Sequence, residues 1–157
     1  MKFYVAGPMS GIKSFNYPLF DEVADVLREM GHEVISPSEM DDAATRKEAM
    51  ASVDGTIVDG KCNGDTWGDF LSRDVKLIAD GEINAICLLP GWEKSRGARL
   101  EAFVALQLGY PMHEWESTCP SSGEDYFPVR VRSTWIMKRI EYGMANPLSN
   151  EEKRYGG

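Results

Sequence analysis

The 157-residue sequence is poor in the residues that crosslinks and metal sites need. It has three cysteines and two histidines, which are Cys62, Cys87, Cys119, His32 and His113. The cysteines form no CxxC pair and have no histidine at metal-ligand spacing, and an odd count does not suit a disulfide framework. Cys87 lies in an apolar run, as a buried hydrophobic residue would. We therefore expect reduced thiols, no metal site and no disulfide-rich fold.

Long apolar runs are also missing from the sequence. No stretch approaches the roughly 20 apolar residues of a membrane span. The first apolar segment reaches Gly7 and Pro8 too soon for the apolar core of a secretory signal peptide. We expect a soluble, cytoplasmic protein without a membrane partner.

Positive charge is scarce, because 17 lysines and arginines face 25 aspartates and glutamates, for a net charge of −8. A non-specific nucleic-acid binder needs a basic surface, so we expect no nucleic-acid partner. A few local donors can still hold a small anion on an acidic protein. A chain of this length buries about 69% of its unfolded surface, which is enough for one core.

Hydrophobic patterning predicts an α/β fold. Short apolar segments bounded by glycine or proline alternate with segments of helical spacing, which is typical of a parallel sheet. We expect strands over 2–6, 33–36, 83–89 and 112–115, and helices over 18–30, 67–79 and 95–108. The prediction is a single-domain open parallel sheet of the Rossmann or flavodoxin type, flanked by helices.

The pattern is weaker in two other parts of the chain. Between 38 and 65 we expect a short exposed helix over 41–48 and then a long loop, which in compact domains often serves as a lid. After an α/β domain over 1–115, a C-terminal extension over 116–157 has no assigned role. It begins with a polar linker, and we expect a surface strand over 129–132 and a helix over 135–143 within it.

Two acidic residues interrupt the apolar faces of two predicted helices. Asp74 shares a face with Phe70 and Ile78, and Glu101 shares one with Ala105. An unpaired buried carboxylate costs several kcal/mol or becomes neutral. Such an acid is either paired structurally or retained for chemistry. Two of them, each near the end of a strand, favour chemistry.

Two loops, 7–12 and 90–97, each follow a predicted strand and precede a helix. Ligands of open α/β sheets bind at these strand ends. Neither loop matches a P-loop or a dinucleotide fingerprint, and Gly7-Pro8 could simply form a tight turn. Ser95 with Arg96 could hold a phosphate at a helix N-terminus, or Ser95 could be an ordinary N-cap.

Three segments resemble the nucleoside 2-deoxyribosyltransferase superfamily, which includes deoxynucleoside monophosphate N-hydrolases and small phage-type members. They are residues 4–11 (YVAGPMSG), Asp74 ahead of Ala79-Asp80, and residues 95–111. The resemblance covers about residues 2–115. Its most specific part is the run Gly-x-x-x-Glu-x-x-x-Ala-x-x-x-Gly-x-Pro, which starts at Gly97.

The resemblance implies cleavage of a nucleoside's N-glycosidic bond through a glycosyl-enzyme intermediate. Glu101 matches the nucleophile that attacks C1′, Asp74 the acid that assists the leaving base, and Tyr4 the tyrosine that positions the nucleophile. No cofactor is expected. The residues expected to bind substrate are Gly7, Pro8, Met9, Ser10, Gly11, Ser95, Arg96 and Gly97. Trp67 and Trp92 could stack on a base or could pack in the core.

One departure bears on the substrate. The deoxyribosyltransferases have an aspartate six residues before the glutamate, whereas this chain has Ser95. The nucleotide hydrolases of the superfamily have a serine there and bind a 5′-phosphate, which an aspartate would repel. A (2′-deoxy)nucleoside 5′-monophosphate is therefore the favoured substrate. Base exchange between nucleosides and a non-catalytic nucleotide-binding module remain as alternatives.

The resemblance also implies self-association. Members of the superfamily close their pocket with a neighbouring subunit, so we expect a homodimer or a larger homo-oligomer. We expect the segment 135–137 (Trp-Ile-Met) to be exposed, as such an interface would require.

Overall fold

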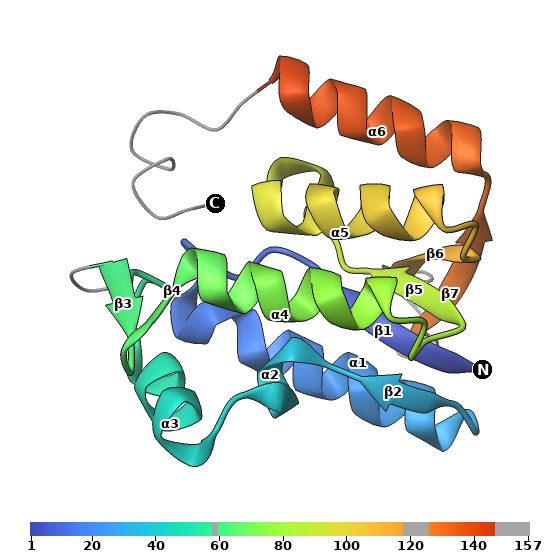
Figure 1. Cartoon of the computed structure of the whole chain (residues 1–157). Helices are drawn as coiled ribbons and strands as arrows, with labels where there is room; N and C mark the ends of the chain where they lie inside the picture. Colours follow the sequence, from blue (N-terminus) through green and yellow to red (C-terminus); the bar gives the residue numbers. More distant parts are fainter. Residues whose placement is uncertain (58–59, 118–125, 147–157) are drawn as a thin grey trace.

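The computed structural model of the chain describes residues 1–57, 60–117 and 126–146 (Figure 1). In this part of the chain, five strands form one sheet in the order β2-β1-β5-β6-β7. The strands are β1 (Lys2–Ala6), β2 (Glu33–Ile35), β5 (Ala85–Leu88), β6 (Met112–Ser117) and β7 (Tyr126–Val131). The first four run parallel, and β7 pairs antiparallel with β6. The predicted α/β class with an open, mostly parallel sheet is confirmed.

Helices cover both faces of the sheet (Figure 1). One face packs against α1 (Tyr17–Glu29). The other packs against α4 (Trp67–Ala79), α5 (Arg96–Gln107) and α6 (Ser133–Ala145). Within the described residues no helix is both long and apolar enough to cross a membrane.

The period-2 alternation of β1 decides which of its side chains belong to the site. Phe3 and Val5 pack with α1, whereas Tyr4 and Ala6 belong to the core shared with α4 and α5. Tyr4 is fully buried. The sheet therefore places the Tyr4 side chain on the same side as the acids of α4 and α5.

The region between β2 and α4 contains more regular structure than its pattern predicts. The short helix expected over 41–48 is α3 (Ala43–Ala51), and the region also holds α2 (Pro37–Met40) and a hairpin of β3 (Lys61–Cys62) with β4 (Asp65–Thr66). The long loop expected before residue 65 is thus wrong in part. Asn63 and Gly64 both have positive φ, which is the turn signal of a two-residue hairpin.

The C-terminal segment adds a strand and a helix to the same layers. The strand expected over 129–132 is β7, and the expected helix is α6, which packs against α5 and the 3-10 turn η3 (Trp92–Lys94). A Cβ atom at Gly143 would lie 1.9 Å from the carbonyl oxygen of Glu93, so only glycine allows this approach. Cys119 and the expected linker after residue 117 lie outside the described residues.

The expectation of an exposed segment 135–137 is wrong for its central residue. Ile136 is fully buried in the core with α5, because the core-facing side of α6 includes Ile136 and Ile140. Met137 is half-buried against the same core. Trp135 alone of the three is exposed, and its indole donates a hydrogen bond to Glu114.

Candidate active site

A pocket lies beside the C-terminal end of β1, with α4 and α5 supplying one wall and the segment from residue 7 to 17 another. Its remaining lining comes from α2 and Asp41 after it, from α3 and Ile57 in the loop beyond it, and from β3. The lining residues are Gly7, Met9, Ser10, Phe15, Tyr17, Pro37, Asp41, Ala49, Ile57, Cys62, Trp67, Phe70, Leu71, Arg73, Asp74, Ser95, Gly97, Ala98 and Glu101.

Glu101 is held at the base of this pocket by Tyr4. The Tyr4 hydroxyl donates a hydrogen bond to Glu101 Oε1 at 2.9 Å, and both side chains are buried. Burial and the neighbouring charge of Asp74 raise the pKa of Glu101 well above its ordinary value, and the Tyr4 hydroxyl opposes this rise. Burial and the nearby carboxyls also keep the pKa of Tyr4 high, so this hydroxyl stays a donor.

Asp74 reaches the same pocket from α4, where it is only 6% exposed. Burial raises its pKa, while the guanidinium of Arg73 and the hydroxyl of Tyr4 lower it. Arg73 donates through Nε to Asp74 Oδ1 at 2.9 Å. The two acids thus have different partners: a neutral hydroxyl holds Glu101, and a cation holds Asp74. Such a pair takes up and releases protons as a unit.

Arg73 has a second anionic partner, because its other end donates to Asp41, which follows α2. The hydroxyl of Tyr17 also donates to Asp41, and burial raises the pKa of Tyr17 above its ordinary value. The resulting chain of hydrogen bonds runs Tyr17–Asp41–Arg73–Asp74 along the pocket. Among the residues of this hydrogen-bond chain, only Asp74 was predicted from the sequence as a site residue; Tyr17, Asp41 and Arg73 were not.

The loop after β1 contributes some of its predicted residues to the pocket and uses others to build the turn. Met9 and Ser10 line the pocket, as does Gly7, where a Cβ atom would lie 2.7 Å from Leu89 Cβ. Pro8 and Gly11 are not among the lining residues. The Pro8 carbonyl accepts from the Asn16 amide, and the Gly11 N–H donates to the Gly55 carbonyl.

The N-terminus of α5 opens onto the pocket through Ser95 and Gly97. Ser95 is the N-cap, and its Oγ accepts from the N–H of Ala98 at 3.3 Å. The hydroxyl proton of this serine stays available to a ligand. Arg96 is exposed and does not line the pocket; its guanidinium stacks 4.2 Å from the ring centroid of Trp67.

Aromatic side chains form much of the apolar lining. Phe15 comes from the segment before α1, Trp67 and Phe70 both come from α4, and all three line the pocket. Phe15 reaches it from a left-handed turn, since Ser14, Phe15 and Asn16 all have φ between 50° and 61°. Trp92 lies outside this pocket, buried against the core, and donates to Glu114 at 2.9 Å. Of the two tryptophans considered for base stacking, Trp67 lines the pocket and Trp92 does not.

The cysteines and histidines have ordinary surroundings. Burial raises the pKa of Cys62 to about 11 and that of Cys87 to about 12, so both thiols are neutral at physiological pH. His32 and His113 each make an edge contact with the ring of Phe3, about 5 Å between centroids. In the described residues no three histidine, cysteine, aspartate or glutamate side chains are grouped as metal ligands.

Comparison with known proteins identifies one matching family. A family model described as a domain of unknown function (DUF4406) matches residues 1–63 and 62–114. These stretches include Tyr4, Asp41, Arg73, Asp74 and Glu101, and they end before β7 and α6 begin. No curated protein matches the chain.

Proposed function

Because the chain belongs to the DUF4406 family, whose description states no activity, we propose a function from the site itself. The proposed reaction is hydrolysis of the N-glycosidic bond of a nucleoside 5′-monophosphate, with 2′-deoxy substrates favoured. Glu101 is the nucleophile, Asp74 is the acid, and Tyr4 positions Glu101.

One observation carries this proposal. Two buried carboxyl groups, on different helices, face one pocket with different hydrogen-bond partners. Glycosidases that retain configuration use two carboxyl groups in different protonation states, and unequal surroundings are what separate those states. A protein that only bound a nucleotide would gain nothing from burying two acids together, since burial destabilises their charged forms.

In the proposed reaction, a Glu101 oxygen attacks C1′ as the bond from C1′ to the base nitrogen breaks. The bonding electrons leave with the base, which takes the proton of Asp74. Water then attacks C1′, gives a proton to the Asp74 carboxylate and releases the Glu101 carboxylate. The sum is nucleotide plus water giving sugar phosphate plus free base, and both acids return to their starting state.

The pocket offers a separate surface for each part of such a substrate. Phe15, Trp67 and Phe70 provide flat apolar surface for a base. The first N–H groups of α5 have no partner within the helix and lie beside the hydroxyl of Ser95, which suits a phosphate. Arg96 flanks the same end of the helix and adds a positive charge.

The test is incubation of the protein with a panel of nucleosides and 5′-monophosphates, in both ribose and deoxyribose series. Chromatography would follow release of the free base. We expect release from monophosphates and none from the same samples with Glu101→Gln. A new nucleotide formed after a second base is added would favour base exchange. Binding without any base release would overturn the enzymatic proposal and leave a nucleotide-binding module.

We also propose that the protein acts as a homodimer or larger homo-oligomer in the cytoplasm. Leu100 and Phe103 on α5 and Trp135 on α6 are each at least 40% exposed, and these two helices are neighbours, so apolar side chains are available there for a subunit contact. Sedimentation at micromolar concentration tests this expectation, and a monomer would contradict it.

A further inference from the structure

Arg73 joins two buried carboxylates that come from different parts of the chain. Its Nε donates to Asp74 on α4, and its terminal nitrogen donates to Asp41 beyond α2. The side chains of Asp41 and Asp74 are only 4% and 8% exposed. A guanidinium can make both contacts because its donors form a rigid planar fork.

The charges around Asp74 do not balance. The titratable side chains that act on it are Arg73 on its own helix, Glu101 from α5, Tyr4 from β1 and Asp41 from the segment after α2. Tyr17 and Cys62 lie next to Asp41 and are neutral. Among these groups, three carboxyls face one guanidinium. Repulsion between buried carboxylates therefore favours a proton shared by Asp74 and Glu101.

We propose that Arg73, anchored by Asp41, is a positioning residue that decides which of Asp74 and Glu101 holds this proton. Its importance for catalysis rests on the proposed function, but the placement of the proton can be measured without any substrate. In the empty pocket Arg73 stabilises the charge of Asp74, so the proton belongs to Glu101.

The reaction needs the opposite arrangement, with Glu101 ionised and Asp74 protonated. One proton must pass from a Glu101 oxygen to an Asp74 oxygen, and no other species is consumed. Once Asp74 is neutral, the half-buried guanidinium of Arg73 would have no anionic partner if Asp41 were absent. Asp41 keeps Arg73 paired in both arrangements, so the transfer does not require the guanidinium to move.

Two substitutions separate this role from a structural one, because they act with opposite signs. Arg73→Gln removes the cation, and the midpoint for titration of Asp74 should rise by about one pH unit or more. Asp41→Asn removes a negative charge, and the Asp74 midpoint should fall by about half a pH unit, since Asp41 acts across Arg73. Loss of packing would disturb both variants in the same direction.

The measurement is the titration of ¹³C-labelled carboxyl groups by NMR in the ligand-free protein. Asp74→Asn and Glu101→Gln assign the two signals. Arg28→Gln is the matched control, because Arg28 also pairs with two acids but lies outside the pocket lining. Its Asp74 titration should equal that of the wild type. Arg73→Lys retains the charge and should stay closer to the wild type than Arg73→Gln.

An Asp74 midpoint that is unchanged in Arg73→Gln, or that moves in the same direction in both variants, would overturn this role. If Arg73→Gln does not fold, the Asp41→Asn variant alone decides. A rise in its Asp74 midpoint would overturn the positioning role of Arg73, and a fall would support it. If the Asp74 midpoint shifts in opposite directions in the two variants but no substrate releases its base, the proposed role of Arg73 is supported and the proposed function is contradicted. If the base is released but the Asp74 midpoint is the same in the variants as in the wild type, the proposed function is supported and the role of Arg73 is contradicted.

Discussion

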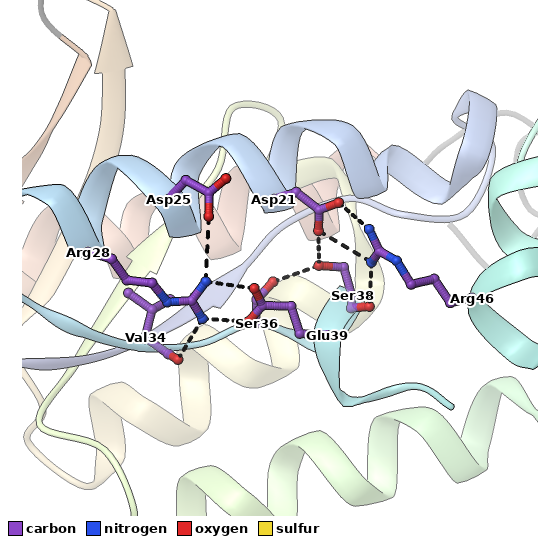
Figure 2. Close-up of polar contacts among 8 residues, drawn as sticks. All are labelled: Asp21, Asp25, Arg28, Val34, Ser36, Ser38, Glu39 and Arg46. Carbon is purple, nitrogen blue, oxygen red and sulfur yellow. Dashed lines mark hydrogen bonds and ion pairs between the residues drawn. The ribbon is translucent and has the colours of Figure 1, made fainter. Parts of the chain in front are cut away.

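Two clusters of acids and arginines lie close together in this protein and differ in how their charges are matched. In the first, which we call the α1–α2 cluster, Arg28 pairs with Asp25 and Glu39, and Arg46 pairs with Asp21 (Figure 2). These charged side chains are 30–74% exposed. In the second, the pocket, Asp41, Asp74 and Glu101 are buried around the single guanidinium of Arg73.

Under the proposed function, the α1–α2 cluster serves the fold and the pocket serves chemistry. The α1–α2 cluster has three acids for two arginines, and its charged side chains are at least 30% exposed, so each ion pair contributes little to stability, about 0–1 kcal/mol. The α1–α2 cluster ties α2 to α1 through Arg28, which also donates to the Val34 carbonyl, and so fixes the segment that leads to Asp41 (Figure 2). The pocket instead buries three acids around one guanidinium, so its excess of negative charge is kept from water. That excess destabilises the fold, and a reactive site is where such a cost is retained.

The largest effect should come from Glu101→Gln, which replaces the nucleophile by a group of the same size. We expect base release to fall at least about a thousandfold, equivalent to about 4 kcal/mol. The measurement is kcat for the best substrate of the panel. A variant that keeps more than about a tenth of the wild-type rate, a loss of only ~1.4 kcal/mol, would contradict the assignment.

Asp74→Asn should have the next largest effect, because the leaving base would no longer receive a proton. A positioned acid contributes about 10²- to 10⁴-fold. The loss should be greatest for bases that leave poorly and smallest for bases that leave readily without protonation. Equal losses for all bases would show that Asp74 acts in some other way.

The phosphate site should have an intermediate effect. A 5′-monophosphate should react better than its nucleoside by roughly 2–4 kcal/mol in kcat/KM, from two or three charge-assisted hydrogen bonds of about 1.5 kcal/mol each. Substituting Ser95 and Arg96 together by alanine should remove this preference and leave cleavage of the nucleoside unchanged. Equal kcat/KM values for the two substrates in the wild type would contradict the phosphate site and favour an enzyme that acts on nucleosides.

Glu101→Gln should stabilise the folded protein although it removes activity. The pKa of Glu101 is raised in the folded protein, so its contribution to stability is present below the ordinary pKa of a glutamic acid, about 4.3, and is lost as pH rises through the folded value. In Glu101→Gln the side chain at this position cannot ionise, so the variant does not lose this stability as pH rises. Its free energy of unfolding should exceed that of the wild type by about 1 kcal/mol or more, with the gap widening between pH 5 and pH 8. Urea unfolding at several pH values measures this, and a gap that narrows would contradict the burial of a titrating acid.

The smallest effect should come from the α1–α2 cluster. Arg28→Gln breaks pairs that are more than a third exposed, so unfolding should become easier by no more than about 1 kcal/mol, and base release should not change. A large loss of base release in Arg28→Gln would show that the α1–α2 cluster affects the pocket and would contradict the distinction between them.

Periodicity predicted the parts of the site that regular elements carry. Asp74 and Glu101 could be placed on amphipathic helices because each interrupts an apolar face. The strand that carries Tyr4 was predicted from its pattern, but Tyr4 itself was expected only through the family resemblance. The sheet then brought them together as parallel strands require.

The rest of the pocket depends on turns that the sequence does not signal. Ser14, Phe15 and Asn16 take left-handed conformations without a glycine, so nothing in the pattern places Phe15 and Tyr17 in the pocket. Asp41 follows a helix of only four residues, α2, and gains its importance from contacts with distant residues. The Asn63-Gly64 turn did carry a signal, which could have predicted the β3–β4 hairpin.

Detection of the proposed covalent intermediate is the most direct test of the chemistry of the pocket. The protein would be mixed with the best monophosphate substrate, quenched in acid within a single turnover, digested and examined by mass spectrometry. We expect the peptide that contains Glu101 to gain the mass of the sugar phosphate less water, and the Glu101→Gln variant to gain nothing. Base release by the wild type with the sugar phosphate on another residue, or with no adduct at any quench time, would contradict Glu101 as the nucleophile.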